Sequence, residues 1–477
     1  MPRFLDLFAG AGGLSEGFIQ AGYTPIAHVE MDAAACYTLK TRAAFHWLRA
    51  NGNIEIYNQY LRGEMTRADF YKHIPQAVLD TVLNYEISSD TISEIFNKVD
   101  SLLGGRDLDL IIGGPPCQAY SLAGRSRSAT KMVGDKRNYL YKHYAEFLRR
   151  YKPRYFVFEN VSGLLSAKDE DGSLHFSNMQ NLFKEYGYST EFRLLNASEY
   201  GVLQNRKRII LIGKYGEDSV DFYPDIPKDT RTHKVGELFC DLPPIHAGEG
   251  EVTPTPSNHY TGKYLFEAGI KEYDGEPVTF HQARPHTQQD LEIYRIVVDT
   301  WNKTETRIAY TDLPEYLRTH RNTKCFLDRF KVVAGNLTCS QTVVAHICRD
   351  GHYYIHPDIK QNRSLTPREA ARIQTFPDNY YFESVTGKED FSFIFHGGVI
   401  FPQPENGLGH NALAGAGFAY HANDLTGADL QIHPVHCGEQ LLPGRELYLQ
   451  PLDFQQGRLI LKAMFHLRFL PAVLGSR

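Results

Sequence analysis

Short apolar runs alternate with longer stretches of helical periodicity through the first part of the chain. Apolar runs of this length are typical of strands that are buried on both faces of a sheet. We predict such strands, all parallel, at Phe4–Phe8, Pro25–Glu30, Leu108–Gly113, Tyr155–Glu159 and Arg208–Gly213. We predict helices between them at Leu14–Gln20, Asp32–Leu48, Asn138–Tyr151 and Asn178–Tyr186. This alternation predicts a doubly wound α/β sheet with right-handed crossovers, in which ligands bind beyond the carboxyl ends of the strands.

The rhythm changes further along the chain. Residues 50–99 form a long polar connection, which we predict to be a mostly helical insertion in a first domain of residues 1–214. From residue 215 to residue 346 prolines, aromatic residues and short polar runs dominate, and they predict a smaller irregular domain. Residues 347–390 contain one more predicted helix, Thr366–Thr375. We expect this last segment to link back to the first domain.

The composition is that of an ordinary globular protein. Of the 477 residues 42% are hydrophobic and 22% are charged, which excludes a disordered chain and a collagen. The seven cysteines form no C-x-x-C pair, so we expect no zinc ribbon, no redox motif and no metal site. Their odd number, the lack of a long apolar stretch and the lack of a signal-peptide pattern predict a cytoplasmic location. The net charge of −5 still allows one basic cleft.

A glycine-rich turn follows the first predicted strand. It reads Asp6-Leu-Phe8-Ala-Gly10-Ala-Gly12-Gly13, and Glu30 ends the next strand. Glycines at this place let the backbone approach a ligand, and an acid about 20 residues on can accept hydrogen bonds from ribose hydroxyls. A nicotinamide site, a flavin site or a simple tight turn would give a similar pattern.

A cysteine stands at the end of a third strand. Gly113-Gly-Pro-Pro-Cys117-Gln-Ala-Tyr-Ser121-Leu-Ala-Gly124 closes the strand Leu108–Gly113. Two prolines make a stiff, extended approach, which favours an exposed nucleophile over a cysteine packed in the core. Such a thiol needs thiolate character to react.

Two more polar clusters lie at strand ends. Glu159-Asn160-Val161 ends one predicted strand, and Gln204-Asn-Arg206-Lys-Arg208 enters another. Taken alone, the first could be a helix cap and the second a solvated basic run.

Together and in this order, the four clusters resemble the DNA cytosine-5 methyltransferases. That family has an F-x-G-x-G turn, a P-C-Q loop, an E-N-V strand end and a Q-x-R-x-R segment. A fifth segment, Arg363 to Asp378, resembles the family's R-x-L-T-x-R-E-x-x-R-x-Q-x-F-P-D motif. The resemblance implies a Rossmann-like catalytic domain that uses S-adenosylmethionine and an irregular target-recognition domain.

The resemblance implies a role for each catalytic residue. Attack of the Cys117 thiolate on C6 of cytosine would make C5 nucleophilic. Glu159 would donate to N3, Arg208 would hold O2, and Arg206 would steady the loop and phosphate near the flipped base. The base that removes the C5 proton is not assigned.

The resemblance also implies the residues around the cofactor. Phe8 and Gly10 would lie against adenosine, Asp6 and Gly12 would shape the turn, and Glu30 would bind the ribose. Met31 would pack on a ring face, and Pro116 and Leu140 would line the methionine side. The acid for the adenine amino group would be Glu86 or Asp107.

The implied partner is double-stranded DNA, from which the target base must be flipped. Residues 122–154 hold ten basic side chains and two acidic ones, and Arg125 to Arg137 is the part that we expect to meet phosphates. Gln118, Ser121, Arg125 and Gln204 are the predicted DNA contacts. Residues 215–346 would read the target sequence, with Arg318, Arg321 and Lys324 among the candidates for base contacts.

The end of the chain departs from the family. No G-N-x-x-P motif is found, and in residues 391–477 the density of charged residues falls by about half. A divergent extension and a shifted reading frame after about residue 390 both fit, and we favour the shift.

The leading hypothesis is a monomeric modification enzyme of a bacterial restriction system, with a cognate endonuclease as its functional partner. The alternatives are a catalytically impaired DNA-binding relative, an RNA cytosine methyltransferase and a nicotinamide dehydrogenase.

Overall fold

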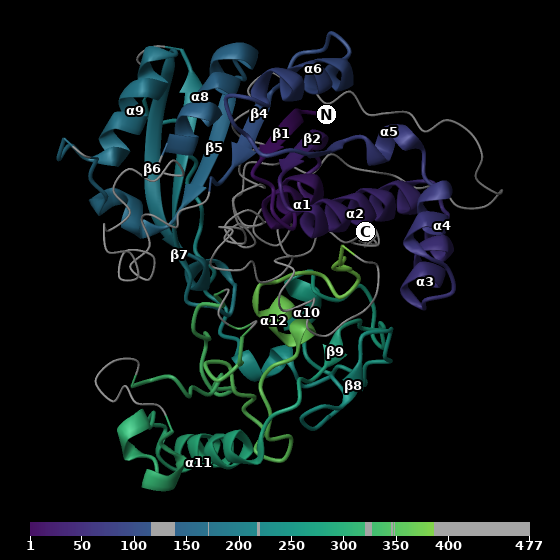
Figure 1. Ribbon diagram of the computed structural model, residues 1–477, viewed down its shortest axis with the longest axis vertical. Coiled ribbons are helices and arrows are strands. Elements are labelled where there is room, and N and C mark those ends of the chain that lie inside the picture. The colour runs from purple at the N-terminus through teal and green to yellow at the C-terminus, as the bar shows by residue number, and fades with distance from the viewer. Residues whose placement is uncertain are drawn as a thin grey trace, which may run out of the picture.

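The computed structural model has two lobes (Figure 1). It describes residues 1–115, 139–169, 171–216, 220–319, 327–344, 347 and 349–385. A large sheet with its covering helices forms the upper lobe, and an irregular lower lobe ends in α11. None of the helices in these ranges is long and apolar enough to cross a membrane.

The upper lobe is built on a seven-stranded sheet with the order β3-β2-β1-β4-β5-β7-β6. Neighbouring strands from β3 to β5 are parallel, whereas β7 runs antiparallel to both β5 and β6. The strands are β1 (Arg3–Leu7), β2 (Thr24–Glu30), β3 (Val82–Asn84), β4 (Leu110–Gly113), β5 (Tyr155–Asn160), β6 (Tyr188–Asn196) and β7 (Lys207–Tyr215).

Helices cover both faces of this sheet, as the alternation of elements predicts. Along β1, Phe4 packs in the core under α1, while Leu5 and Leu7 pack under α6, α8 and α9. Alternate residues of a strand point to opposite faces, so one apolar run fills two cores. The helices are α1 (Gly13–Gln20), α2 (Ala33–Ala50), α6 (Ile92–Leu103), α8 (Leu140–Tyr151) and α9 (His175–Glu185).

The prediction of a parallel strand at Arg208–Gly213 is wrong in its direction. Residues of β7 pair antiparallel with β5, with Asn160 opposite Ile209, and with the whole of β6. An apolar run indicates that a strand is buried on both faces, and this pattern is the same for a parallel and an antiparallel strand. The edge strand β6 was missed because its side chains are mostly half-buried or exposed.

The segment predicted as an insertion is mostly helical, but it also completes the sheet. It contains α3 (Ile54–Leu61), α4 (Arg67–Lys72), α5 (Gln76–Leu79) and the start of α6. Between α5 and α6 lies β3, which pairs with β2 at the edge of the sheet. Three residues are too short a run for periodicity to reveal.

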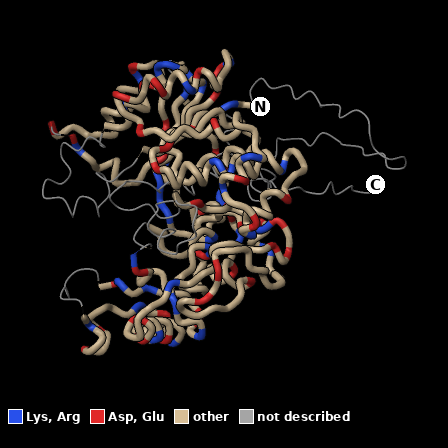
Figure 2. The backbone as a smooth tube through the Cα atoms, turned by 45° about the vertical axis from the view of Figure 1, so that its right-hand side comes forward, with Lys and Arg blue, Asp and Glu red and all other residues tan. Residues whose placement is uncertain are grey.

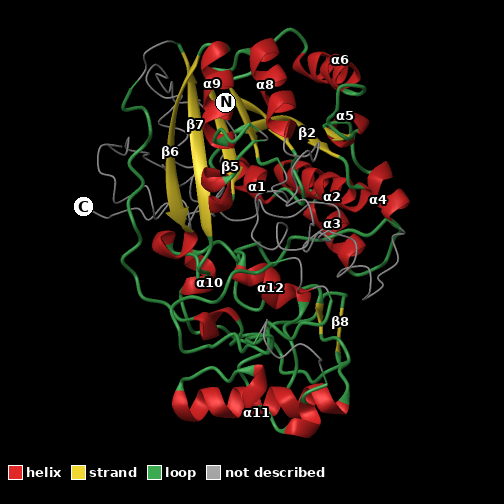
Figure 3. Cartoon of the chain, turned by 60° about the vertical axis from the view of Figure 1, so that its left-hand side comes forward, coloured by secondary structure: helices red, strands yellow, loops and turns green. Residues whose placement is uncertain are grey.

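The lower lobe has little regular structure, as its composition predicts (Figure 3). Its long helix α11 (Gln288–Thr304) packs on a separate cluster that includes Trp301, Tyr310 and Phe330. A second cluster joins α2 and α3 of the upper lobe to α12 and Phe376. The short elements of the lower lobe are α10 (Tyr264–Glu267), α12 (Pro367–Ile373), β8 (Gly250–Glu251), β9 (His281–Gln282), and the 3-10 turns Val235–Leu238, Tyr310–Asp312 and Glu315–Leu317. Two further 3-10 turns, Ser162–Ser166 and Ala197–Tyr200, belong to the upper lobe.

Basic and acidic residues are interspersed over both lobes (Figure 2). On α8, Arg149 pairs with Glu146 and Arg150 pairs with Asp100, so part of the predicted basic stretch is a paired surface. Residues 122–138, which hold Arg125 to Arg137, lie outside the described residues.

Candidate active site

The predicted clusters within the described residues lie at the carboxyl ends of the parallel strands, and we call this end of the sheet its carboxyl edge. The glycine turn follows β1, Glu30 ends β2, and Glu159 and Asn160 end β5. Since β7 is antiparallel, its start lies at this same edge, with Ile209 opposite Asn160. The antiparallel strand therefore brings Arg206 and Arg208 beside Glu159, although they enter a strand rather than leave one.

The backbone after β1 makes a tight turn. Phe8, Gly10 and Gly12 all have positive φ, at 58°, 56° and 83°. A Cβ on Gly12 would lie 2.8 Å from both Leu39 Cδ2 and the Tyr380 hydroxyl, so this position requires glycine. A Cβ on Gly10 would meet nothing within 4 Å. The turn thus leaves open space beside Gly10.

The turn is held from inside by Asp6. Its carboxylate is fully buried and accepts a 2.7 Å hydrogen bond from the Ser15 hydroxyl in α1. Asp6 therefore joins β1 to α1 across the turn.

Glu30 is a buried carboxyl at the end of β2. It accepts hydrogen bonds of 2.8 Å from the backbone N–H groups of Gly10, Met31 and Asp32. Burial nevertheless raises its pKa to about 7. Met31, beside it, is 50% exposed and presents an apolar face to solvent.

The two candidates for the adenine-contacting acid lie at opposite ends of the strands, one at the carboxyl edge and one at the amino edge of the sheet. Glu86 follows the carboxyl end of β3, next to β2. Asp107 precedes β4 and lies at the amino end of the strands. Only Glu86 shares an edge with Glu30, so the geometry favours Glu86.

Glu159 and Arg208 form a buried ion pair. Glu159 Oε1 lies 2.6 Å from Arg208 Nε, and these residues are 2% and 7% exposed. Burial raises the pKa of Glu159, although Arg208 and Arg206 oppose the rise. A carboxyl in this setting keeps its acid form to higher pH than a solvated one, which suits a proton donor.

The segment that carries the two arginines is fixed by other chain segments. The Arg206 backbone N–H donates to Asn196 Oδ1, and its side chain is 1% exposed. Gln204, a predicted DNA contact, is fully buried, and its amide donates to the carbonyl of Ile373. In this conformation Gln204 links the segment that carries the two arginines to the end of α12, and its side chain does not face solvent.

Pro115, which follows β4, is held to the end of β5. The Asn160 side chain donates a 3.1 Å hydrogen bond to the carbonyl of Pro115. Leu140 begins α8 and is half-buried. The predicted residues Pro116, Cys117, Gln118, Ser121 and Arg125 lie outside the described residues.

The fifth motif forms a buried network of ion pairs that supports the site. Arg363 binds Glu369, and Arg372 binds both Asp378 and Asp241, with all five side chains at most 1% exposed. Beyond this network, the Tyr380 hydroxyl donates to the carbonyl of Ala11 in the glycine turn. The sequence identified this motif but not its contact with the turn, and its many charges gave no sign of burial.

The described residues contain no cluster of histidine, cysteine or acidic side chains that could hold a metal ion. The turn and the acid instead match what a nucleoside needs. Glycines open the space, Glu30 can accept from ribose hydroxyls, and Met31 can cover a ring. A sheet of this order, with this turn and acid at the carboxyl ends of its strands, has the Rossmann-like fold of a methyltransferase domain.

Comparison with known proteins identifies the family. The profile of the C-5 cytosine-specific DNA methylases matches residues 2–70 and 76–394, and the chain belongs to this family. It is a DNA (cytosine-5) methyltransferase that uses S-adenosylmethionine. The match ends close to the break in composition near residue 390.

Individual relatives agree with this assignment. A type II methyltransferase of Bacillus paralicheniformis is 40% identical over 422 residues, covering 80% of this chain and 92% of that protein. One from Xanthomonas oryzae pv. oryzae is 29% identical over 396 residues, covering 80% and 78%. The fold is similar to a solved E. coli structure, described as a prophage-encoded DNA modification methyltransferase, with a TM-score of 0.55 and 21% identity over 89% of this chain and 99% of that one.

Proposed function

We propose that the chain methylates C5 of a flipped-out cytosine by covalent catalysis at the carboxyl edge of the sheet. The buried Glu159–Arg208 pair carries this proposal, because it places an acid and a fixed cation side by side. Asn160, the next residue, holds the backbone that leads to Cys117.

The residues share the work as follows. The Cys117 thiolate bonds to C6 while the Glu159 proton moves to N3, so the electrons of the C5–C6 double bond become available at C5. Arg208 holds O2 during this shift, and Arg206 steadies the phosphate near the flipped base. S-adenosylmethionine supplies the electrophilic methyl group. Loss of the C5 proton to a base then restores the double bond and expels the thiolate, and N3 returns its proton to Glu159.

The cofactor lies, in this proposal, across the ends of β1, β2 and β3. Phe8 and Gly10 contact adenosine, Glu30 accepts from the ribose hydroxyls, Met31 covers the ring, and Glu86 accepts from the adenine amino group. Pro116 and Leu140 line the methionine side.

The biological setting we propose is a bacterial restriction system. The two relatives compared above are both type II methyltransferases, and the chain spans 92% and 78% of their lengths. The enzyme would act as a monomer and protect the sites of a cognate endonuclease on double-stranded DNA.

The covalent step can be tested by trapping. A long duplex is made with 5-fluorocytosine in place of every cytosine, so that every target sequence is present. Fluorine cannot leave C5 as a proton does, so the protein–DNA bond persists. We expect a band resistant to detergent with the intact chain and with Cys240→Ser, but none with Cys117→Ser.

Two other outcomes would count against the proposal. Methyl transfer to ordinary DNA without a trapped band would contradict the covalent route. Neither transfer nor a band would support the alternative of a DNA-binding relative impaired by its altered C-terminus.

The high pKa of Glu30 makes a separate prediction for cofactor binding. Ribose hydroxyls donate to the ionised carboxylate, so binding lowers a pKa that starts near 7 and releases a proton. The affinity for S-adenosylmethionine should therefore increase by up to about tenfold from pH 6 to pH 8. Calorimetry in buffers of different ionisation enthalpy measures the released proton directly. In Glu30→Gln both the release and this pH dependence should disappear; a release that persists would assign it to another group.

A further inference from the structure

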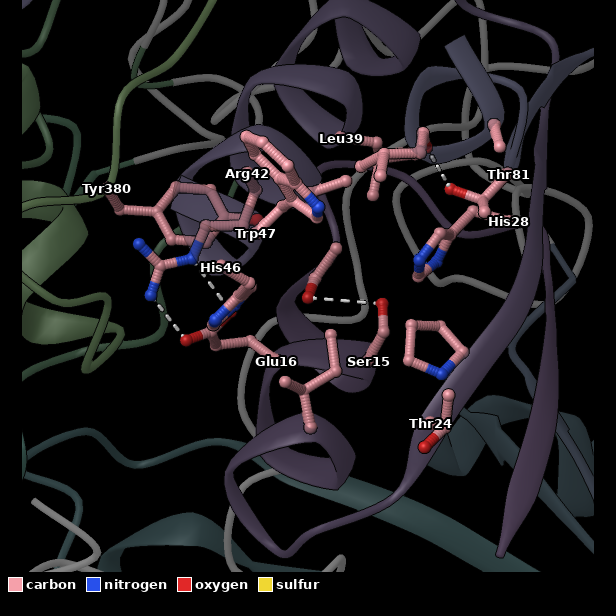
Figure 4. Close-up of a pocket in the computed structure, with 16 residues that line it drawn as sticks. Ser15, Glu16, Thr24, His28, Leu39, Arg42, His46, Trp47, Thr81 and Tyr380 are labelled. Atoms are coloured by element: carbon pink, nitrogen blue, oxygen red, sulfur yellow. Dashed lines mark hydrogen bonds and ion pairs between the residues drawn. The ribbon is translucent and has the colours of Figure 1, made fainter. Parts of the chain in front are cut away.

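A cavity of about 380 Å³ lies behind the glycine turn, on the face of the sheet that α1 and α2 cover (Figure 4). Its walls come from α1, β2, α2 and α5, with Tyr380 at one side. Small-molecule sites in proteins enclose about 300–1,000 Å³, so the space is sufficient for a ligand.

This cavity is separate from the proposed cofactor position. Thr24 and Pro25, which line it, begin β2, whereas Glu30 ends β2. At about 3.3 Å per residue, Pro25 and Glu30 are roughly 16 Å apart along the strand, and His28 and Glu30 roughly 7 Å. A molecule that contacts His28 therefore lies against the face of the sheet, beside the proposed cofactor position and not in it.

Most of the cavity wall is apolar, which favours a ligand whose surface is mostly apolar. Hydrophobic side chains line it from three helices and from β2, and burying a ligand against them removes apolar surface from water. These residues are Ile19, Pro25, Leu39, Ala43, Ala77 and Val78.

The charged groups at the cavity are already paired with one another. Arg42 binds Glu16 through two nitrogens, at 2.5 and 2.9 Å, and His46 Nε2 lies 3.1 Å from Glu16. The remaining Arg42 nitrogen donates to Asn379. Because these charges are satisfied within the protein, the site does not select a charged ligand.

Two polar groups in the wall are available for hydrogen bonds. His28 is 4% exposed, and its Nδ1 has no hydrogen-bond partner among the described residues; Asp6 Oδ2, at 3.6 Å, is too distant. The indole N–H of Trp47 likewise makes no hydrogen bond within the described part of the chain. His28 from β2 and Trp47 from α2 lie on opposite sides of the cavity (Figure 4).

We propose that this cavity binds an uncharged, planar heteroaromatic molecule, of the size of a substituted purine, between His28 and Trp47. Flat rings match apolar walls on their faces and present hydrogen-bonding atoms at their edges, where the imidazole and the indole N–H can meet them.

Binding there acts on the cofactor turn. Gly12 and Ser15 belong to the cavity wall, and Ser15 also holds Asp6 behind the turn. A ligand that fixes this wall changes the affinity for S-adenosylmethionine, and the cofactor changes the affinity for the ligand by the same factor.

The two tryptophans of the chain provide a direct test. In Trp301→Phe, Trp47 is the single tryptophan and reports on the cavity. In Trp47→Phe the single tryptophan is Trp301, which donates to Asn336 in the lower lobe. Benzimidazole, an uncharged planar probe, should change the emission of Trp301→Phe with a dissociation constant below about 1 mM and leave Trp47→Phe unchanged.

A second pair of variants checks the location. In the Trp301→Phe background, Ala43→Leu narrows the cavity and should weaken benzimidazole binding at least about tenfold. Ala50→Leu, at the exposed end of the same helix, should not. The probe should also still bind in saturating S-adenosylmethionine, with both affinities shifted by a common factor of about five.

Three results would overturn the proposal: no emission change in Trp301→Phe at 10-fold higher probe concentration, equal changes in both single-tryptophan proteins, or displacement of benzimidazole by S-adenosylmethionine. Circular dichroism of each variant confirms that the fold is retained.

Discussion

Glu159→Gln is expected to lower kcat for methyl transfer by about 10²- to 10⁴-fold, because glutamine can donate a hydrogen bond to N3 but cannot transfer a proton. The substitution preserves the size of the side chain beside Arg208, so DNA and cofactor binding should change little. The loss should appear in kcat more than in KM. Labelled methyl transfer under saturating DNA and S-adenosylmethionine measures it.

The same residue predicts the pH dependence of the rate. The proton donor must be in its acid form, and that fraction falls as the pH increases through its pKa. Burial raises the pKa of Glu159, so the decline in kcat should begin at higher pH than for a solvated glutamate. In Glu159→Gln this alkaline decline should be absent.

Glu185→Gln, at the exposed end of α9, is the matched control, because it removes a carboxylate far from the site. An unchanged kcat in Glu159→Gln would remove Glu159 from the mechanism.

Arg372→Met is expected to lower the free energy of unfolding by about 3–5 kcal/mol, because it leaves two buried carboxylates without their main cation. Arg372 is fully buried and binds Asp241 at 2.5 and 3.1 Å and Asp378 at 2.6 and 2.8 Å. Methionine fills a similar volume, so the change isolates the lost charge. Lys271 still binds Asp241, 2.9 Å away, and this ion pair limits the loss in the free energy of unfolding.

Urea unfolding followed by circular dichroism measures this loss. Burial opposes the ionisation of Asp241, but Arg372 and Lys271 outweigh it and lower the pKa below 3.8. A lowered pKa contributes stability above the unfolded value and loses it as the pH falls through the folded value. The difference between the wild type and Arg372→Met should therefore narrow in acid.

Arg62→Met removes an arginine from two exposed ion pairs, with Glu55 and Glu64, and should not change the urea midpoint measurably. Equal stability of Arg372→Met and the wild type would mean that the buried network contributes nothing net.

The sequence predicted the parts of the fold that local pattern determines. Buried runs such as Tyr155–Glu159 gave the central strands, and the motifs at their ends gave the edge where Glu30 and Glu159 lie. These predictions succeeded because burial on both faces and a strand end each leave a local signature.

Other features depend on contacts between distant segments. The direction of β7 follows from its pairing with β6, and β3 is recognisable only by its contact with β2. Full burial of Gln204 depends on α12, which is far away in the chain. The burial of Arg372 and Asp378 likewise depends on their pairing with one another, which the sequence does not show.

The two hydrophobic clusters that contain lower-lobe residues determine which segments related enzymes can exchange without loss of packing. The cluster around α11 draws its buried members only from residues 293–355, but the same stretch also gives Val333, Val343, Ile347 and Tyr354 to the other cluster. The other cluster shares side chains between α2 and the segment that contains α12. A chimaera that exchanges only residues 288–317 leaves every member of the second cluster unchanged, whereas one cut at residues 215 and 346 replaces one side of it. Exchange of α11 with the turns that follow it therefore disturbs the packing between the two lobes least.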